Sequence, residues 1–189
     1  MCSSDLISGI ESTYGKYAIY GNHDVDEPLL GGFTFVDAED TSRNAGLPRF
    51  MDDCGWTVLE DQIITIPELG NLIIVGRRDL MRPGDGIAER EPLDRLLAQV
   101  DPDDAVIMLE HEPDELDSLD RFGVDLVVSG HTHDGQIFPG NIVSRISSPQ
   151  SYGIKQWGET TAAVTSGVGF YGPPIRVGTI SEVVIIEAS

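Results

Sequence analysis

Cysteine is scarce in this sequence, and its scarcity excludes one class of architecture. The 189 residues contain only Cys2 and Cys54, and neither lies in a Cys-x-x-Cys motif or next to a histidine. A disulfide framework or a thiolate metal site requires more cysteines at closer spacing. We therefore expect Cys54, at the end of a helix-like stretch, to be a packing residue.

Basic residues and long apolar runs are also scarce. Lys and Arg number 12 against 32 Asp and Glu, which gives a formal net charge of −20. Such a surface repels polyanions and argues against a nuclease, although acidity is equally well explained as a solubility device. No run reaches the roughly 20 apolar residues of a membrane span, and residues 1–15 do not resemble a secretion signal. The sequence as given predicts a cytoplasmic chain.

The alternation of apolar runs and helical patterns predicts one α/β domain over residues 1–189. Residues 1–16 are expected to end an amphipathic helix, and residues 25–50 to form a surface excursion. Strands are expected at Tyr17–Tyr20, Leu72–Val75, Ala105–Glu110 and Val124–Ser129, with a hairpin of Trp56–Leu59 and Gln62–Ile66 and antiparallel strands at Ala162–Ser166 and Glu182–Glu187. Leucine spacing predicts helices at Ala88–Val100 and Pro113–Phe122.

The sequence has four histidines, and each follows the end of an expected strand. His131 and His133 are two residues apart, so in an extended backbone their side chains point the same way. Ligands of open α/β sheets bind beyond the carboxyl ends of the strands. A single histidine there is more often structural, but the four together, with His23 and His111, predict one polar site.

The residue types at these strand ends favour a catalytic metal site. Asn22, His111 and His131 offer neutral oxygen and nitrogen donors, and imidazole suits manganese, iron, zinc or nickel. Three protein ligands with an open position are typical of catalytic metals, and His133 could serve a second ion. His23 is a candidate general acid with Asp24 as its orienting carboxylate, and the alternative for His23 is a further ligand.

Three motifs together resemble a known family. Gly21–Asp24, His111–Pro113 and Gly130–His133 resemble, in order, the last three motifs of the calcineurin-like metallophosphoesterases. Gly76–Asp79 and Gly169–Arg176 are similar to a bacterial branch of small phosphohydrolases that is often tethered to membranes. The resemblance covers nearly the whole chain. It implies an α/β fold of two mixed β-sheets packed face to face with flanking helices.

The resemblance also implies roles for individual residues. It implies that Asn22, His111 and His131 hold one divalent ion and that His133 holds another, with Mn, Fe or Zn as candidates. It implies that His23 contacts the phosphate and assists the leaving group, and that Asp24 orients His23. Asp134 stands where this branch usually has glycine, a departure expected to alter the rim of the site and to spare the ligands.

Two motifs of that family are absent. Its members open with an Asp-x-His strand end and a Gly-Asp-x-x-Asp strand end, and neither occurs here. We therefore expect an amino-terminally shortened member that lacks its first strands and part of one metal site. Membrane association of the parent protein is expected only through such a missing segment.

Three hypotheses for function remain open at this point. The first is hydrolysis of a small phosphodiester or phosphomonoester by metal-activated water, with poor or no turnover by the shortened chain. The second is a non-catalytic metal-binding or interaction module derived from the same family. The third is a structural relative whose histidines hold no metal.

Overall fold

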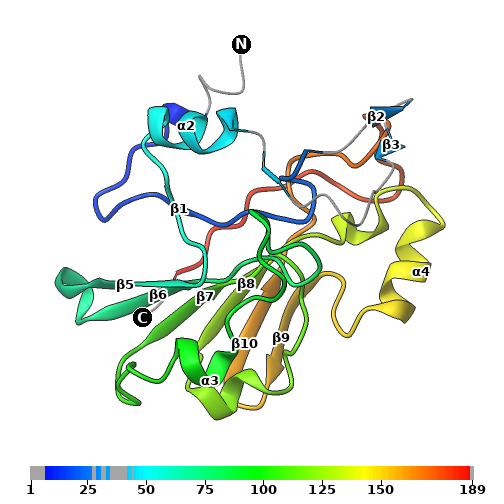
Figure 1. The fold of residues 1–189 in the computed structure, drawn as a ribbon. Helices are drawn as coiled ribbons and strands as arrows, with labels where there is room; N and C mark the ends of the chain where they lie inside the picture. Colours follow the sequence, from blue (N-terminus) through cyan, green and yellow to red (C-terminus); the bar gives the residue numbers. More distant parts are fainter. Residues whose placement is uncertain (1–6, 27–28, 31–32, 35–41, 44, 188–189) are drawn as a thin grey trace.

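One mixed sheet forms the centre of the molecule in the computed structural model, which describes residues 7–26, 29–30, 33–34, 42–43 and 45–187. Its strand order is β5-β6-β7-β8-β10-β9 (Figure 1). The strands are β5 (Gln62–Ile66), β6 (Leu72–Gly76), β7 (Val106–Leu109), β8 (Leu126–Ser129), β9 (Gly153–Trp157) and β10 (Thr160–Val164). The four central strands run parallel, and β5 and β9 pair antiparallel at the edges. The carboxyl ends of the parallel strands therefore share one edge.

A second, smaller sheet covers one face of the first. It consists of β1 (Tyr17–Ala18) and β4 (Thr57–Val58), which pair in parallel. Figure 1 shows these strands above the β5–β6 end of the large sheet. Buried Leu59, Ile66 and Ile74 fill the space between the two sheets. Gly76 permits this packing, because a Cβ at that position would collide with the Cβ of Leu59.

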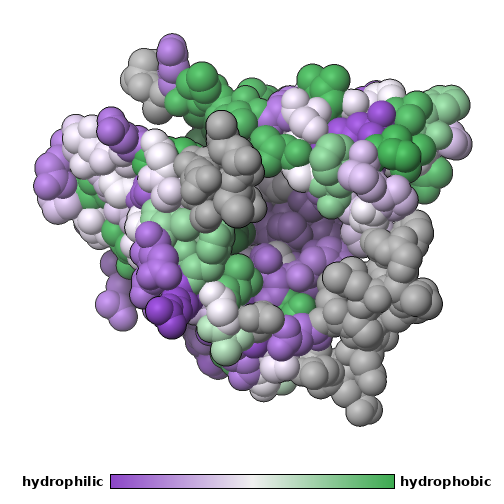
Figure 2. Space-filling model, turned by 90° about the horizontal axis from the view of Figure 1, so that it is seen from above, coloured by the Kyte–Doolittle hydropathy of each residue, from purple (hydrophilic) through white to green (hydrophobic). Residues whose placement is uncertain are grey.

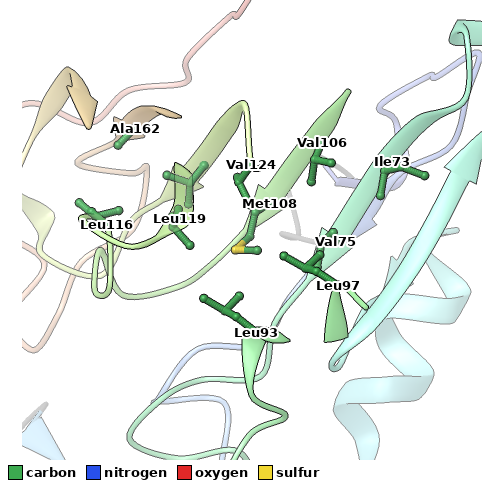
Figure 3. Close-up of a cluster of buried hydrophobic side chains, with 11 residues drawn as sticks. Ile73, Val75, Leu93, Leu97, Val106, Met108, Leu116, Leu119, Val124 and Ala162 are labelled. Carbon is green, nitrogen blue, oxygen red and sulfur yellow. The ribbon is translucent and has the colours of Figure 1, made fainter. Parts of the chain in front are cut away.

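The main core lies on the opposite face of the large sheet (Figure 3). Along β6, Ile73 and Val75 belong to this core while Ile74 belongs to the other cluster, as alternation in a strand requires. Leu93 in helix α3 (Leu93–Leu96) and Leu97 at its C-cap cover the core, and Leu119 covers it from the 3-10 turn η2 (Leu119–Phe122). The other members are Val106, Met108, Leu116, Val124, Val127 and Ala162.

The remaining elements are short. The helices are α2 (Gly46–Asp53), α3 (Leu93–Leu96) and α4 (Gly140–Ser147), with 3-10 turns η1 (Pro67–Leu69), η2 (Leu119–Phe122) and η3 (His133–Gly135). β2 (Leu29–Leu30) and β3 (Phe33–Thr34) form a separate antiparallel pair. No helix of the described residues is long and apolar enough to cross a membrane. Cys54 is buried at the end of α2, which confirms its packing role, and Cys2 lies outside the described residues.

The α/β fold expected from the sequence is confirmed, and the local strand signals were largely correct. β6, β7 and β8 occupy the runs expected at Leu72–Val75, Ala105–Glu110 and Val124–Ser129. The first strand is shorter than expected, because β1 ends at Ala18. The helix expected at residues 1–16 falls partly outside the described residues. So does the excursion expected at residues 25–50, of which the structure describes β2, β3 and α2.

The expected hairpin of Trp56–Leu59 with Gln62–Ile66 is wrong. β4 pairs with β1 and β5 pairs with β6, so the chain passes from one sheet to the other between them. Asp61 makes this crossing at φ 54°, and its carboxylate accepts hydrogen bonds from the backbone N–H groups of Arg78 and Glu91. These bonds tie the crossing to residues that are distant in the sequence.

The two expected helices are much shorter than their leucine spacing indicated. The Ala88–Val100 pattern forms only α3, because Pro92 occupies the N-cap and restricts the residue before it. The Pro113–Phe122 pattern forms only η2. Glu115, which precedes η2 in this stretch, adopts φ 54°, outside the helical region. The leucines still reach the core, since burial alone does not require a long helix.

The expected antiparallel pairing of Ala162–Ser166 with Glu182–Glu187 is also wrong. β10 pairs in parallel with β8 and antiparallel with β9. Residues 182–187 form no strand within the described part of the chain. Glu182 instead binds through its carboxylate to the hydroxyl of Thr165 and the backbone N–H of Ser166, both at 3.0 Å.

Truncation of Met108, whose exposed fraction is 0%, tests the position of the main core. We expect Met108→Ala to lower the free energy of unfolding by about 2–5 kcal/mol, because it leaves a cavity between β7 and its neighbours. Urea unfolding followed by circular dichroism measures the change. Ile146→Ala on α4, where Ile146 is 80% exposed, is the control and should change it by about 0.5 kcal/mol or less. Equal losses in both variants would contradict the assigned core.

Candidate functional site

The predicted site residues meet at the carboxyl edge of the parallel strands. β7 leads into His111, β8 leads into His131 and His133, and the segment after β1 carries Asn22 and His23. Register bonds bring the ends of β7 and β8 together: the N–H of Gly130 donates to the carbonyl of His111 at 3.1 Å. Seen from this side, the surface is hollowed and the hollow is hydrophilic (Figure 2).

Two other potential ligand atoms lie close to the Nε2 atom of His111 at this edge. The Oδ1 atom of Asn22 lies 3.0 Å from it and the Nδ1 atom of His131 lies 3.1 Å from it. The two imidazole rings meet edge to face, with centroids 5.0 Å apart. Two donors bound to one ion at about 2.1 Å and about 90–109° are roughly 3.0–3.4 Å apart, so this spacing fits a shared ion.

The electrostatic state of the histidines suits metal binding. Burial, together with the charges of His131, His23 and His133, lowers the pKa of His111 to about 4. Burial also lowers the pKa of His131, against the opposing charge of Asp79. Neutral imidazoles at neutral pH have the lone pairs that a metal ligand needs.

The turn Gly21–Asp24 presents Asn22 and His23. The carboxylate of Asp24 accepts a hydrogen bond of 2.7 Å from the N–H of Gly21 and thereby closes the turn. The His111 ring lies against Gly21 so closely that a Cβ there would be 2.6 Å from the ring. The ring of His23 lies 5.1 Å from that of Tyr171, tilted by 32°. The carboxylate of Asp24 thus binds the backbone of the turn that carries His23, the residue that Asp24 was expected to orient.

His133 lies beside an arginine from the far end of the chain. The Nη2 atom of Arg176 is 3.3 Å from the Nδ1 atom of His133, and its Nη1 atom donates to the His133 carbonyl at 3.3 Å. The extended backbone expected for His131 and His133 is wrong, because β8 ends at Ser129 and the two residues adopt left-handed φ values of 64° and 50°. Burial and the charge of Arg176 lower the pKa of His133.

The ligand set of a second ion is not assembled by the described residues. Among them, no three or more His, Cys, Asp and Glu side chains are grouped so as to hold a metal ion. The cluster of Asn22, His111 and His131 combines two imidazoles with an amide. The spacing of the donor atoms in this cluster fits one ion.

Comparison with known proteins decides the family. The family model described as calcineurin-like phosphoesterase matches residues 5–135. The chain belongs to the calcineurin-like phosphoesterase family. Members of this family generally use divalent metal ions, in agreement with the donor set. No solved structure gives a significant match.

Several metallophosphoesterases are similar over most of the chain. An uncharacterized metallophosphoesterase of Helicobacter pylori is 28% identical, and one of Campylobacter jejuni is 31% identical, over 96% of this chain and 44% of theirs. One of Aquifex aeolicus is 30% identical over 97% of this chain and 64% of its own. A transmembrane protein with metallophosphoesterase domain from Bos taurus is 36% identical over 51% of this chain and 23% of its own. The chain thus spans less than half the length of the first two relatives.

Two buried carboxylates near the histidines had no role assigned from the sequence. Glu112 has its Oε1 atom 3.7 Å from the Nε2 atom of His131, and burial and the charge of Asp79 raise the pKa of Glu112 to about 7. Asp79 accepts hydrogen bonds from the N–H groups of Met81 and Arg82. Asp79 lies in the Gly76–Asp79 motif and Glu112 in the His111–Pro113 motif. Their place in these motifs was the feature of the sequence that could have identified them as site residues.

Asp134 does not change the rim in the way that a solvent-facing carboxylate would. It is 5% exposed, and its Oδ2 atom pairs with Arg145 of α4 at 3.0 Å. Its backbone N–H donates to the hydroxyl of Thr132 at 3.2 Å. The carboxylate therefore fastens α4 to the turn that carries His133.

A network of two arginines and two glutamates supports the loop that carries His111. Arg77 donates to Glu110 at 3.2 Å and to Glu115 at 2.9 Å, and Arg90 pairs with the same two carboxylates at 2.7 and 2.6 Å. Glu110, which precedes His111, is 1% exposed, and burial raises its pKa despite both arginines. The two positive and two negative charges balance. Their ion pairs join the ends of β6 and β7 to the loops that follow them.

The pH dependence of stability tests this network. Burial opposes the shift, but hydrogen bonds from Arg77 and Arg90 lower the pKa of Glu115. A carboxyl with a lowered folded pKa stabilises the protein above its unfolded pKa of about 4.3, and this contribution is lost as the pH falls. We expect Glu115→Gln to cost about 1 kcal/mol at pH 7, because Glu115 is partly exposed, and less at pH 3.5. Urea unfolding of both proteins at pH 7 and at about pH 3.5 measures the loss of unfolding free energy. An equal loss at the two pH values would refute the assigned ion pairs.

Proposed function

We propose that this chain carries the metal-binding and proton-donating side of a phosphoesterase that hydrolyses small phosphoesters by metal-activated water. The observation that supports it most strongly is the convergence of Asn22, His111 and His131 on one point, with both imidazoles neutral. A divalent ion held there would neutralise charge on phosphoryl oxygens and lower the pKa of a water molecule. Mn²⁺, Fe²⁺ and Zn²⁺ all suit this donor set.

The residues around the cluster would orient the substrate and move a proton. His23 is placed by the Gly21–Asp24 turn and by the ring of Tyr171, and it would protonate the oxygen of the leaving group. The guanidinium of Arg82 donates to the carbonyl of Asn22 at 3.0 Å and so steadies the ligand. In this assignment Asp24 acts through the backbone of the turn.

The charge of the chain supports a small substrate. With a formal net charge of −20, the surface as a whole disfavours a nucleic acid, whereas a single phosphoester needs only the local cluster. We propose a small phosphodiester or phosphomonoester as the substrate. The relative from Bos taurus, which is named as a transmembrane protein, supports the proposal that the protein associates with membranes.

A non-catalytic metal-binding module is the second candidate. It is favoured by the finding that the described His, Cys, Asp and Glu side chains form no group of three or more suited to an ion. Such a module would bind one ion through Asn22, His111 and His131 and show no turnover. Hydrolysis assays therefore separate the two candidates once ion binding is established.

Two histidine variants test the proposed roles. We expect His131→Ala to abolish Mn²⁺ binding, measured by elemental analysis and calorimetry, because it removes one of three ligands. His23→Ala is the matched control for binding and should keep the ion while lowering kcat for bis(p-nitrophenyl) phosphate by about 10²-fold or more.

The outcomes distinguish the hypotheses. Full Mn²⁺ stoichiometry in His131→Ala would refute the assigned cluster. Slow turnover by the unmodified chain that His23→Ala abolishes would support the enzyme over the binding module, for which no turnover by any variant is expected. A His23→Ala variant with unchanged kcat would remove His23 from the proton-transfer step.

A further inference from the structure

We propose that the ring of Tyr171 binds the leaving group of the substrate beside His23, and that the substrate is therefore a phosphoester of an aromatic alcohol. The proposed function, on which this assignment rests, holds the phosphoryl group at the Asn22–His111–His131 cluster and gives the leaving oxygen to His23. The chemical class of the group attached to that oxygen is what is added here. Tyr171 is the residue that touches this group, and Gln136 is the residue that positions Tyr171.

Tyr171 lies in the loop that follows β10, at the same edge of the sheet as the histidines. β10 runs parallel to β8, so the two strands end on the same side. Arg176 holds the beginning of the loop, because its Nη2 atom donates to the carbonyls of Ser166 and Gly169, both at 2.7 Å. The chain is therefore fixed shortly before it reaches Tyr171.

The backbone of Tyr171 is held by the side-chain amide of Gln136. The Oε1 atom of Gln136 accepts from the N–H of Tyr171 at 2.6 Å, and its Nε2 atom donates to the carbonyl of Tyr171 at 2.7 Å. The same Nε2 atom donates to the carbonyl of Pro173 at 3.3 Å. Gln136 is buried, with an exposed fraction of 7%. Because both ends of a buried amide are bonded to this one segment, the direction in which Tyr171 projects its ring is fixed.

The ring that this backbone presents lies beside His23 and remains open to a ligand. The centroids of the two rings are 5.1 Å apart, and the rings are tilted by 32°. His23 is exposed, and Tyr171 keeps an exposed fraction of 43%. His23 also follows Asn22 directly in the chain, so the aromatic surface adjoins the proposed ion site. Ligand sites commonly combine aromatic walls with a few polar groups in this way.

The position of Tyr171 beside the proposed general acid determines which part of the substrate it meets. A general acid lies within hydrogen-bond distance of the oxygen that it protonates, so the first atoms of the leaving group lie next to His23. Aromatic rings attract one another in offset or edge-to-face arrangements with centroids about 4.5–7 Å apart, beyond the effect of burial alone. A flat ring joined directly to the ester oxygen can reach Tyr171 in this way. An alkyl group gains only the burial of its apolar surface.

Three phosphonates that resist hydrolysis test the subsite, with their affinities for the Zn²⁺-loaded chain measured by calorimetry. Phenylphosphonate and cyclohexylphosphonate carry rings of similar size, of which only the first is flat and aromatic, and methylphosphonate carries no ring. We expect phenylphosphonate to bind about three- to tenfold more tightly than cyclohexylphosphonate. Methylphosphonate reports on the proposed ion and phosphoryl site alone.

Variants separate ring binding from a packing role of Tyr171. Tyr171→Leu should bring the ratio of phenylphosphonate to cyclohexylphosphonate affinity to about one, and Tyr171→Phe should restore it. Tyr14→Leu is the matched control, because Tyr14 is also 43% exposed, and it should keep the ratio of the unmodified chain. Gln136→Met, which keeps the length of the side chain without its amide, should lower the ratio because the ring is no longer held in place.

The results divide the subsite from the function on which it rests. An affinity ratio of about one in the unmodified chain, or a ratio that Tyr171→Leu leaves unchanged, would overturn the subsite. A ratio that Gln136→Met leaves unchanged would reject Gln136 as the positioning residue. Failure of methylphosphonate to bind would instead refute the proposed function. Phenol and cyclohexanol, which need no ion, would then test the subsite by nuclear magnetic resonance: only phenol should shift the ring resonances of Tyr171, and equal shifts with both would overturn the inference.

Discussion

The parallel pairing of β7 with β8 is the constraint on which the site depends. Its register places Leu109 beside Val128, and the N–H of Gly130 bonds to the carbonyl of His111. This pairing brings together the residues that follow β7 and β8. A slip of one residue in either strand would move the imidazole that follows it away from the other, because side chains alternate along a strand.

The two faces of the large sheet make this pairing stable. Ile73 and Val75 pack into the main core and Ile74 into the cluster under β1 and β4, so the central strands are buried on both sides. Ion pairs fix the loops beyond the strand ends. They are joined by Arg77, Arg90 and two glutamates, whose paired charges offset part of the cost of leaving water.

Local signals in the sequence were sufficient for the parts of the fold that local physics determines. Apolar runs ending in glycine or histidine predicted β6, β7 and β8 and brought Asn22, His111 and His131 to one edge, as the structure shows. The roles of these residues stay predictions. The pairing of β4 with β1 was not predictable from the adjacent sequence, because the stronger short-range signal favoured a hairpin.

The residues overlooked at the site share one property. Asp79, Glu112 and Arg176 act on residues that are distant in the chain, such as His131 and His133, and no spacing rule connects them. Burial of a carboxylate and the direction of a guanidinium are also properties of the folded chain. Motif matching marked the segments that contain all three and could not say which side chain each would face.

The balanced network beside His111 has a consequence for how the molecule responds to ionic strength. Its two arginines have side chains 2% and 5% exposed and Glu110 is 1% exposed, so mobile ions screen the attraction of the arginines to Glu110 much less than they screen charges at the surface. The excess of acidic groups, which gives the chain its charge of −20, lies elsewhere and repels itself across the surface. Added salt therefore weakens the repulsion while the attraction persists, and the loop that carries His111 is held most securely, relative to the rest of the molecule, in concentrated electrolyte.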